Sequence, residues 1–528
     1  MLGLVLVVLL GASVLLSGVL AGRLRLAPPV LLLGCGVLLG FVPALREVHL
    51  PPEAVLLLFL PALLYWESLT TSLREIRRDL RGIVLMGTAL VIVTAGTVAT
   101  AAHLLGLPWG PAWVLGAALA PTDATAVGVL ARMLPRRNVT LLRAESLIND
   151  GTALVIYSLA VGITVGEERL GTLHVSWLFL LAYGGGALAG LAVAWLGVRV
   201  RGRLDDPLLG NVVTILTPFT AFLLAEVVHA SGVVAVVVCG LAMSQSGPRV
   251  VRAETRRQAE AFWSLATFLL NGALFVLVGL EVQAAVRGLA GVDLVRGLAA
   301  VAVISVVVFG ARLAFLTVSA YGIRVLDRRP QQRLRRVSNR ARVVSAVAGF
   351  RGAVSLAAAL AVPATLASGE PFPGRDTIVF VTAGVIVVTL VLQAPLLPAV
   401  VRWARLPADT SIERERRLAE TTATQEVLAG LQELAAELGT DPQAAAELRR
   451  EYDAHLRVLR AQGEDGADEA ALRHHEDYTA LRLAAIAHKR ATVVRLRDEA
   501  RIDDTVLRRV QARLDLEEVR LSGRELVE

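Results

Sequence analysis

The segment LLRAESLINDGTALVIYSLAVGI, residues 141–163, is apolar along most of its length but contains Glu145 and Asp150. About 20 apolar residues are enough for a helix to cross a bilayer. A charged side chain at the bilayer centre costs at least about 2.5–3.5 kcal/mol, so it persists where it pairs, lines a cavity or has a function. This segment therefore predicts a transmembrane helix that contains a functional polar site.

Helical spacing gathers the polar residues of this segment on one side. Glu145 and Asn149 are four residues apart and share a face of the helix. Ser146 and Asp150 share the adjoining face in the same way. We therefore expect one hydrated stripe of four polar groups. A polar contact between two helices is the alternative, although two carboxylates so close together are costly for that purpose alone.

Segments of this kind recur along the first 402 residues. Of the 528 residues, 55% are hydrophobic, which is more than a soluble chain of this length normally contains. We predict an all-α membrane protein with about thirteen transmembrane helices. The predicted spans are residues 2–20, 28–44, 53–69, 82–105, 111–132, 141–163, 174–198, 208–229, 231–246, 259–285, 292–319, 342–362 and 376–401.

The distribution of charge divides the chain into two parts. Residues 1–402 contain 33 basic and 20 acidic residues, a balance of +13, whereas residues 403–528 contain 20 basic and 26 acidic residues, a balance of −6. The second part is rich in Ala, Leu, Glu and Arg, which favours helices. We predict a transmembrane domain over 1–402 and a helical cytoplasmic tail over 403–528. The basic excess is typical of loops facing anionic lipid and does not indicate a nucleic-acid partner.

The loop arginines predict how the chain is oriented in the membrane. Loops after odd-numbered spans contain 25 arginines, and loops after even-numbered spans contain five. Lys and Arg are in excess in cytoplasmic loops. This distribution therefore predicts an N-terminus outside the cell and a C-terminal tail in the cytoplasm, and it supports an odd number of spans.

A second acidic residue lies in the middle of the span at 111–132, within Ala120-Pro121-Thr122-Asp123-Ala124-Thr125. Proline removes one backbone donor and frees a carbonyl one turn earlier. We therefore expect a break in this helix that exposes backbone oxygens beside Asp123. Such hard oxygen ligands suit a small cation. A simple proline kink capped by Asp123 is the alternative.

A buried arginine lies at the centre of the span at 342–362. Arg351 stands between Gly349-Phe350 and Gly352, and these glycines permit a bend or a close approach. Arginine stays protonated in proteins, so Arg351 requires an acidic partner. Glu145 is the partner that we predict. Arg312, in the span at 292–319, is a second buried cation for which the sequence indicates no partner.

This pairing leaves Asp123 and Asp150 to act together. Two carboxylates in one nonpolar site repel each other when both are ionised, so a proton or a cation stabilises the pair. Protons and a small cation then compete for the same oxygens, and competition with alternating access is sufficient for exchange. We predict no cofactor and no enzyme activity. An intramembrane enzyme with an aspartate acid–base pair and an ion sensor with the tail as its output are remote alternatives.

Together these motifs resemble the monovalent cation/proton antiporter family, in particular its NhaP-like bacterial sodium/proton antiporters. The resemblance covers roughly residues 1–402, and the motifs occur in the family's order. It implies thirteen spans with inverted repeats and broken helices, a homodimer, and a core domain that moves against a dimerisation domain. The matching motifs are Pro121–Asp123, Glu145–Gly151, Ser231–Ala235, Phe275–Leu280 and Phe350–Ser355.

The resemblance also implies roles for individual residues. Asp150 is the main carboxylate for both the cation and the proton. Asp123 and Ser146 are further ligands of sodium, and Thr122 contributes its backbone oxygen. Asn149, beside the main aspartate, matches a branch described as electroneutral. The resemblance implies a sodium- or lithium-for-proton antiporter of the bacterial plasma membrane that serves pH homeostasis, and potassium/proton exchange is the alternative.

The family's ion pair falls on Glu145 and Arg351, which agrees with the pairing predicted from the residues. Two positions depart from the family's pattern. Ala124 follows Asp123 where the family often has proline. Glu67 follows its proline at a different spacing, and it is either a residue where the cation enters or an interfacial cap.

Overall fold

A computed structural model describes residues 2–24, 27–45, 55–123, 134–166, 172–288, 292–326, 338–406, 409–462 and 468–522. The chain forms two compact units, Met1–Ala408 and Asp409–Glu528, which are treated separately below as the membrane unit and the tail unit. The described residues are helical apart from turns and loops, with a single isolated bridge between Thr365 and Pro371. The all-helical class predicted from the sequence is therefore confirmed.

Helices make up the membrane unit. They are α1 (Leu2–Leu24), α2 (Pro28–Leu39), α4 (Leu60–Thr70), α5 (Leu73–Val84), α6 (Leu90–Leu104), α7 (Trp109–Leu119), α8 (Arg136–Val165), α9 (Thr172–Arg201), α10 (Pro207–Val227), α11 (Gly232–Val250), α12 (Ala253–Gly288), α13 (Val292–Leu326), α15 (Asn339–Val347), α16 (Ala353–Leu360), α17 (Arg375–Val388) and α18 (Ala394–Ala404). Short π-helical segments precede α4 (η2, Val55–Phe59), join α5 to α6 (η3, Leu85–Ala89) and join α17 to α18 (η5, Thr389–Gln393).

These helices coincide with the predicted spans. Among the described residues, eight helices are long and apolar enough to cross a membrane, and three shorter apolar helices cover 28–39, 57–70 and 232–247. The two remaining predicted spans, 111–132 and 342–362, contain helices that stop near their middle. The structure thus has a helix at every predicted span, and the number of thirteen crossings stays a prediction.

The boundary between α10 and α11 follows from local sequence. α10 ends at Val227, and His229 adopts a left-handed backbone conformation with φ of 55°. The side chain of Ser231 then accepts a hydrogen bond from the backbone N–H of Val234 and begins α11. Two helices therefore form where the sequence has an almost unbroken apolar run.

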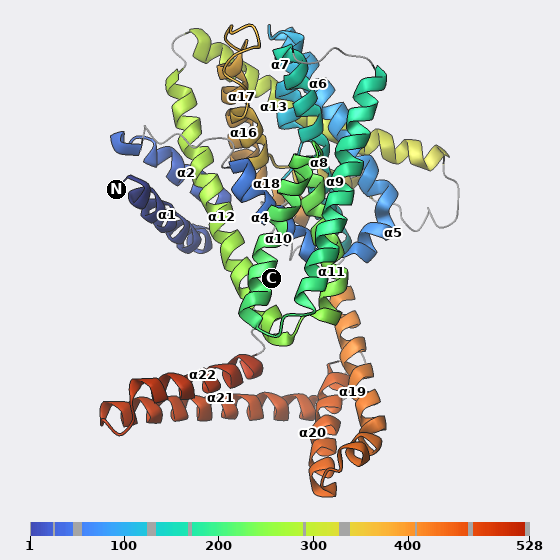
Figure 1. Ribbon diagram of the computed structural model, residues 1–528, viewed down its shortest axis with the longest axis vertical. Helices are drawn as coiled ribbons and strands as arrows, with labels where there is room; N and C mark the ends of the chain where they lie inside the picture. Colours follow the sequence, from blue (N-terminus) through green and yellow to red (C-terminus); the bar gives the residue numbers. More distant parts are fainter. Residues whose placement is uncertain are drawn as a thin grey trace. The chain divides into compact units, whose positions relative to one another are not determined.

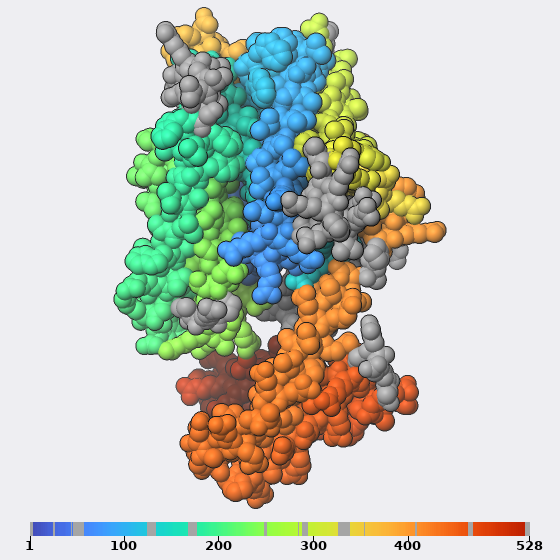
Figure 2. All heavy atoms as spheres, turned by 90° about the vertical axis from the view of Figure 1, so that its right-hand side faces the viewer, coloured from blue at the N-terminus to red at the C-terminus, as the bar shows by residue number. Residues whose placement is uncertain are grey.

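Three main clusters of buried apolar side chains hold the membrane unit together. One joins α4, α9, α10 and α11 around Tyr65, another joins α6, α7, α13 and α17 around Leu115, and the third joins α1, α2, α12 and α17 around Val276. α12 runs along nearly the whole membrane unit, and α1 lies at the edge of this unit (Figure 1). On the face shown in Figure 2, the column of α5, η3 and α6 lies between α9 and the C-terminal part of α13.

The tail unit contains four helices, α19 (Ser411–Leu438), α20 (Pro442–Ala461), α21 (Glu469–Asp498) and α22 (Asp504–Ser522). α19 packs on α20, and α21 packs on α22. Arg482 on α21 pairs with Glu517 on α22 at 2.6 Å, and Arg490 on α21 pairs with Asp515 at 2.6 Å. The helices predicted for residues 403–528 are thus present as two packed pairs.

Candidate functional site

Two non-helical segments meet inside the membrane unit. α7 ends at Leu119, and the chain is non-helical from Ala120 to Asp123; α15 ends at Val347, and α16 begins only at Ala353. Where they meet, the backbone N–H of Asp123 donates a hydrogen bond to the carbonyl of Phe350 at 2.9 Å. The loss of helical structure predicted at Pro121 is therefore confirmed, and it has a counterpart between α15 and α16. The rest of the predicted span, residues 124–132, lies outside the described residues.

A glycine lets the two segments touch. A Cβ atom on Gly352 would lie 1.8 Å from Oδ2 of Asp123, so no other residue fits without displacing this carboxylate. Gly352 is also the residue before the first turn of α16. The N-terminus of a helix has a partial positive charge that stabilises an adjacent anion. Asp123 thus lies against the end of a helix that favours its negative charge.

Arg351 lies beside backbone carbonyls at the C-terminal side of α7 and α15. Its Nε donates to the carbonyl of Leu119 at 3.0 Å, and its Nη1 donates to the carbonyl of Gly349 at 2.6 Å. Leu119 is the last residue of α7, and Gly349 follows the end of α15 by two residues. Carbonyl oxygens at the C-terminal end of a helix have partial negative charge. The side chain is 2% exposed. A buried cation is therefore compensated by backbone carbonyls of α7 and of the segment after α15.

The predicted ion pair between Glu145 and Arg351 is wrong. Glu145 instead pairs with Arg312 of α13, whose Nη1 and Nη2 donate to the two carboxylate oxygens at 2.5 and 3.1 Å. Both side chains are at most 3% exposed. Arg312 reaches Glu145 because Gly349 has no side chain: a Cβ atom there would lie 2.6 Å from Nε of Arg312. A two-pronged pair of this kind is the strongest arrangement that arginine makes with a carboxylate.

A chain of hydrogen bonds connects this ion pair to the interrupted helix. Nδ2 of Asn149 donates to the hydroxyl of Thr122 at 2.7 Å, and that hydroxyl donates to Oε1 of Glu145 at 3.4 Å. The hydroxyl of Thr122 is thus committed to its neighbours. The role of the backbone oxygen of Thr122 as a ligand, implied by the resemblance, stays a prediction.

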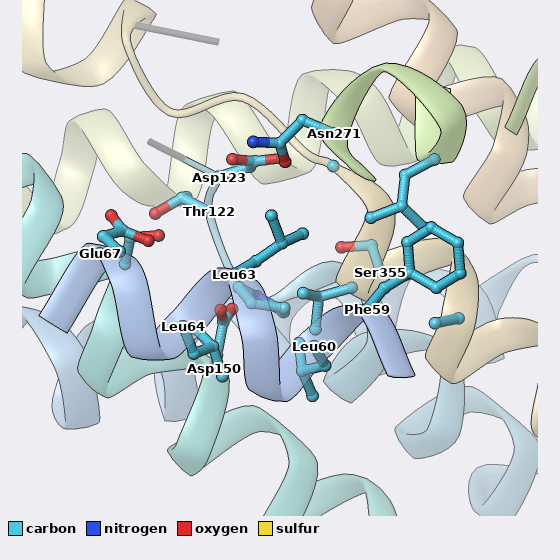
Figure 3. Close-up of a pocket in the computed structure, with 16 residues that line it drawn as sticks. Phe59, Leu60, Leu63, Leu64, Glu67, Thr122, Asp123, Asp150, Asn271 and Ser355 are labelled. Carbon is cyan, nitrogen blue, oxygen red and sulfur yellow. The ribbon is translucent and has the colours of Figure 1, made fainter. Parts of the chain in front are cut away.

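A single pocket gathers most of the predicted site residues (Figure 3). It has a volume of about 600 Å³ including its mouth, and Asp123, Asp150 and Glu67 line it together. Asp150 lies within electrostatic reach of both Asp123 and Glu67. Three carboxylates, two from helices α4 and α8 and one from the non-helical segment after α7, therefore face one space whose other walls are largely apolar. The lining residues include Phe59, Leu60, Leu63, Leu64, Pro121, Thr122, Ser146, Leu274 and Val354.

Other predicted residues lie behind the pocket rather than on its wall. Asn149, Glu145 and Arg351 do not line it, and they act through hydrogen bonds to the residues around it. The pocket also contains Asn271 of α12 and Ser355 of α16. Neither residue is among the predicted site residues, although Ser355 belongs to the motif Phe350–Ser355.

The chain's relatives are consistent with this arrangement. A family model described as sodium/hydrogen exchanger, transmembrane, matches residues 10–403. The chain belongs to the sodium/hydrogen exchanger family. The exchanger is therefore a cation/proton antiporter, and the suspected family is confirmed.

Individual relatives extend the match beyond the membrane unit. The exchanger is 46% identical over 521 residues to an "uncharacterized Na+/H+ exchanger" of Mycobacterium tuberculosis, covering 98% of this chain and 96% of the relative. It is 30% identical over 421 residues to a "sodium, potassium, lithium and rubidium/H+ antiporter" of Bacillus pumilus, covering 77% and 63% respectively.

A solved structure matches the fold. The sodium proton antiporter MjNhaP1 of Methanocaldococcus jannaschii superposes with a TM-score of 0.60 at 20% identity, covering 76% of this chain and 99% of that one. Among the described residues, no three His, Cys, Asp or Glu side chains converge as ligands of a metal ion.

Proposed function

We propose that the exchanger moves sodium, or lithium, in exchange for protons, with the cation and the proton competing for Asp150 and Asp123. The observation that carries this proposal is that both carboxylates line one pocket beside a broken helix. Carboxylates in a nonpolar space repel each other unless a positive charge joins them. Either a proton or a small cation provides that charge, so binding of one favours release of the other.

Oxygen atoms for a dehydrated cation are available around these carboxylates. Ser146 lies one helical turn before Asp150 on α8 and lines the same pocket. The backbone oxygen of Thr122 lies in the non-helical segment next to Asp123. Unwound backbone carbonyls commonly coordinate sodium in transporters with broken helices. We therefore assign sodium to Asp123, Ser146, Asp150 and the backbone oxygen of Thr122.

We also propose that the exchange is electroneutral, because the charge of Glu145 is already compensated by Arg312. Glu145 is held by Arg312, so it is not available to carry an additional proton. Replacing one proton on Asp150 by one sodium ion leaves the charge of the pocket unchanged. We therefore propose a ratio of one sodium to one proton, with Glu67 where the cation enters.

We also propose that the exchanger lies in the bacterial plasma membrane. The excess of arginines in alternate loops supports an outside N-terminus and a cytoplasmic tail. Labelling of single cysteines placed before α1 and after α22 in intact cells tests this orientation. A homodimer, implied by the family resemblance, is tested by the mass of the purified protein in detergent.

Everted membrane vesicles test the exchange itself. Vesicles energised by respiration accumulate protons, and added sodium chloride releases them through an exchanger, which restores the fluorescence of a pH dye. We expect this recovery with the unaltered protein and its loss in Asp150→Asn. Sodium binding without any recovery would indicate an ion sensor instead.

Potassium/proton exchange is the second candidate. It is favoured by the Bacillus pumilus relative, whose name includes potassium and rubidium as well as sodium and lithium. The pocket offers oxygen ligands, and oxygen ligands bind both sodium and potassium. Titration of the same vesicles with each chloride salt decides, because the preferred ion gives half-maximal recovery at the lowest concentration.

A further inference from the structure

Ser355 is a buried hydroxyl with an unusual lack of partners. Its side chain is 1% exposed and lines the pocket, and its Oγ has no hydrogen-bond partner among the described residues. A buried polar group without a partner costs about 1–3 kcal/mol. Such a group at the wall of a pocket indicates a partner that occupies the pocket during function.

The position of Ser355 explains why its hydroxyl stays unpaired. Many helical hydroxyls of this protein donate to the carbonyl four residues earlier, as Ser68 does to Leu64 at 2.6 Å. Ser355 is the third residue of α16, so the residue four positions earlier is Arg351, in the non-helical segment. The break in the helix thus frees this hydroxyl for the pocket.

Asn271 faces the same space from α12. Asn271 and Asp123 point toward each other, and the hydroxyl of Ser355 is directed into the space beside them (Figure 3). An amide oxygen and a hydroxyl oxygen can both coordinate a cation, and neither oxygen carries a formal charge. The carboxylate of Asp123 is therefore flanked by two neutral oxygen groups from different helices.

We propose that Ser355 and Asn271 form a neutral subsite for the transported cation beside Asp123, and that Ser355 helps to set the preference for a cation over a proton. This inference rests on the proposed function. A cation gains from every oxygen that surrounds it, whereas a proton is satisfied by one carboxylate oxygen. Removing a neutral oxygen therefore weakens cation binding and leaves proton binding as it is.

Ser355→Ala tests the subsite directly. In proteoliposomes we expect the sodium concentration for half-maximal exchange to rise about three- to tenfold, which corresponds to the loss of one polar contact. The maximal rate at saturating sodium and its dependence on pH stay unchanged. Ser355→Thr keeps the hydroxyl and restores the sodium dependence, and Asn271→Leu shifts it in the same direction as Ser355→Ala.

A matched control is available on α13. Ser305 also has a buried hydroxyl without a partner among the described residues, but it does not line the pocket. Ser305→Ala should therefore leave the sodium dependence unchanged. An unchanged sodium requirement in Ser355→Ala, or a lower maximal rate with the same sodium requirement, would overturn the proposal.

Sodium binding to the purified protein separates this inference from the proposed function. Calorimetric titration in detergent measures sodium affinity without any transport. If the unaltered protein exchanges no ions but Ser355→Ala still weakens sodium binding, the subsite stands and the transport proposal fails. If exchange occurs and the affinity of Ser355→Ala equals that of the unaltered protein, the subsite is wrong.

Discussion

Arg312 on α13 donates from both terminal nitrogens to the carboxylate of Glu145 on α8, at 2.5 and 3.1 Å. Its Nε also donates to the carbonyl of Ser345 at 3.0 Å. The guanidinium of Arg312 thus connects α13, α8 and α15. The ion pair connects helices beside the pocket, and the carboxylates that line the pocket, Asp123, Asp150 and Glu67, are not part of it.

Arg312→Gln tests whether the ion pair between Arg312 and Glu145 stabilises the protein. Removing one partner of a buried ion pair leaves an uncompensated charge and costs about 3–5 kcal/mol. We therefore expect a clearly lower melting temperature in detergent for Arg312→Gln and for Glu145→Gln. In a double-mutant cycle, Glu145 should couple strongly to Arg312. Stronger coupling of Glu145 to Arg351 would show that the pairing is assigned to the wrong arginine.

Gly352→Ala tests the contact between Asp123 and α16. The added Cβ would meet Oδ2 of Asp123 at 1.8 Å, so the carboxylate has to move. We expect at least about a tenfold loss of sodium affinity, since a shift of one ångström at a binding group can cost that much. Gly184→Ala on α9 is the control, because nothing lies within 4 Å of its Cβ position. Normal affinity in Gly352→Ala would contradict the close contact.

Thr152→Val tests a junction near Asp150. The hydroxyl of Thr152 bonds to the carbonyl of Gly87 at 2.7 Å and to the hydroxyl of Tyr183 at 2.6 Å, which joins α8 to η3 and α9. Valine removes both hydrogen bonds, so we expect a loss of about 1–3 kcal/mol, measured by chemical unfolding in detergent. Thr152→Ser should retain most of the stability. A Thr152→Val variant as stable as the unaltered protein, or a larger loss in Thr152→Ser than in Thr152→Val, would contradict this role of the hydroxyl.

Glu67→Gln distinguishes an attracting charge from a charge that takes part in exchange. Glu67 lines the pocket with Asp123 and Asp150. If it draws the cation in, we expect exchange to continue with about a three- to tenfold higher sodium requirement, similar to the loss of one charged contact. Complete loss of exchange, as expected for Asp150→Asn, would place Glu67 among the residues that carry the exchanged proton.

Acid should loosen the pair of helices α21 and α22 in the tail unit. The hydrogen bond from Arg482 holds the pKa of Glu517 below its usual range. The stabilising effect is therefore present above the ordinary Glu pKa of about 4.3 and is lost as the pH falls through the lowered value. Spin labels on α21 and α22 of the full chain should separate in acid. In Arg482→Gln this contribution is absent at every pH, so the two helices should be less tightly paired at neutral pH and should change less on acidification.

Much of the site could be predicted from single residues in the sequence. Pro121 beside Asp123 predicted a broken helix, and the spacing of Ser146 and Asp150 predicted a shared face, because both depend on local backbone rules. The partner of Glu145 depends on tertiary structure. Arg312 and Arg351 are both buried cations, and the choice between them depends on the space that Gly349 leaves in the folded protein.

Asn271 and Ser355 could not be placed in the pocket from sequence for a similar reason. A lone amide or hydroxyl in an apolar span usually bonds within its own helix or to a neighbour. Only the contact between the segment after α7 and the segment between α15 and α16 brings their helices to Asp123.

Proton release on sodium binding is the most direct measurement of competition at Asp150. Purified protein in detergent and very weak buffer is mixed with sodium chloride while a pH dye is followed, with choline chloride as the ionic-strength control. We predict that sodium releases about one proton per protein molecule, and that Asp150→Asn releases none. Sodium binding without proton release in the unaltered protein, or the same release in Asp150→Asn, would contradict the account.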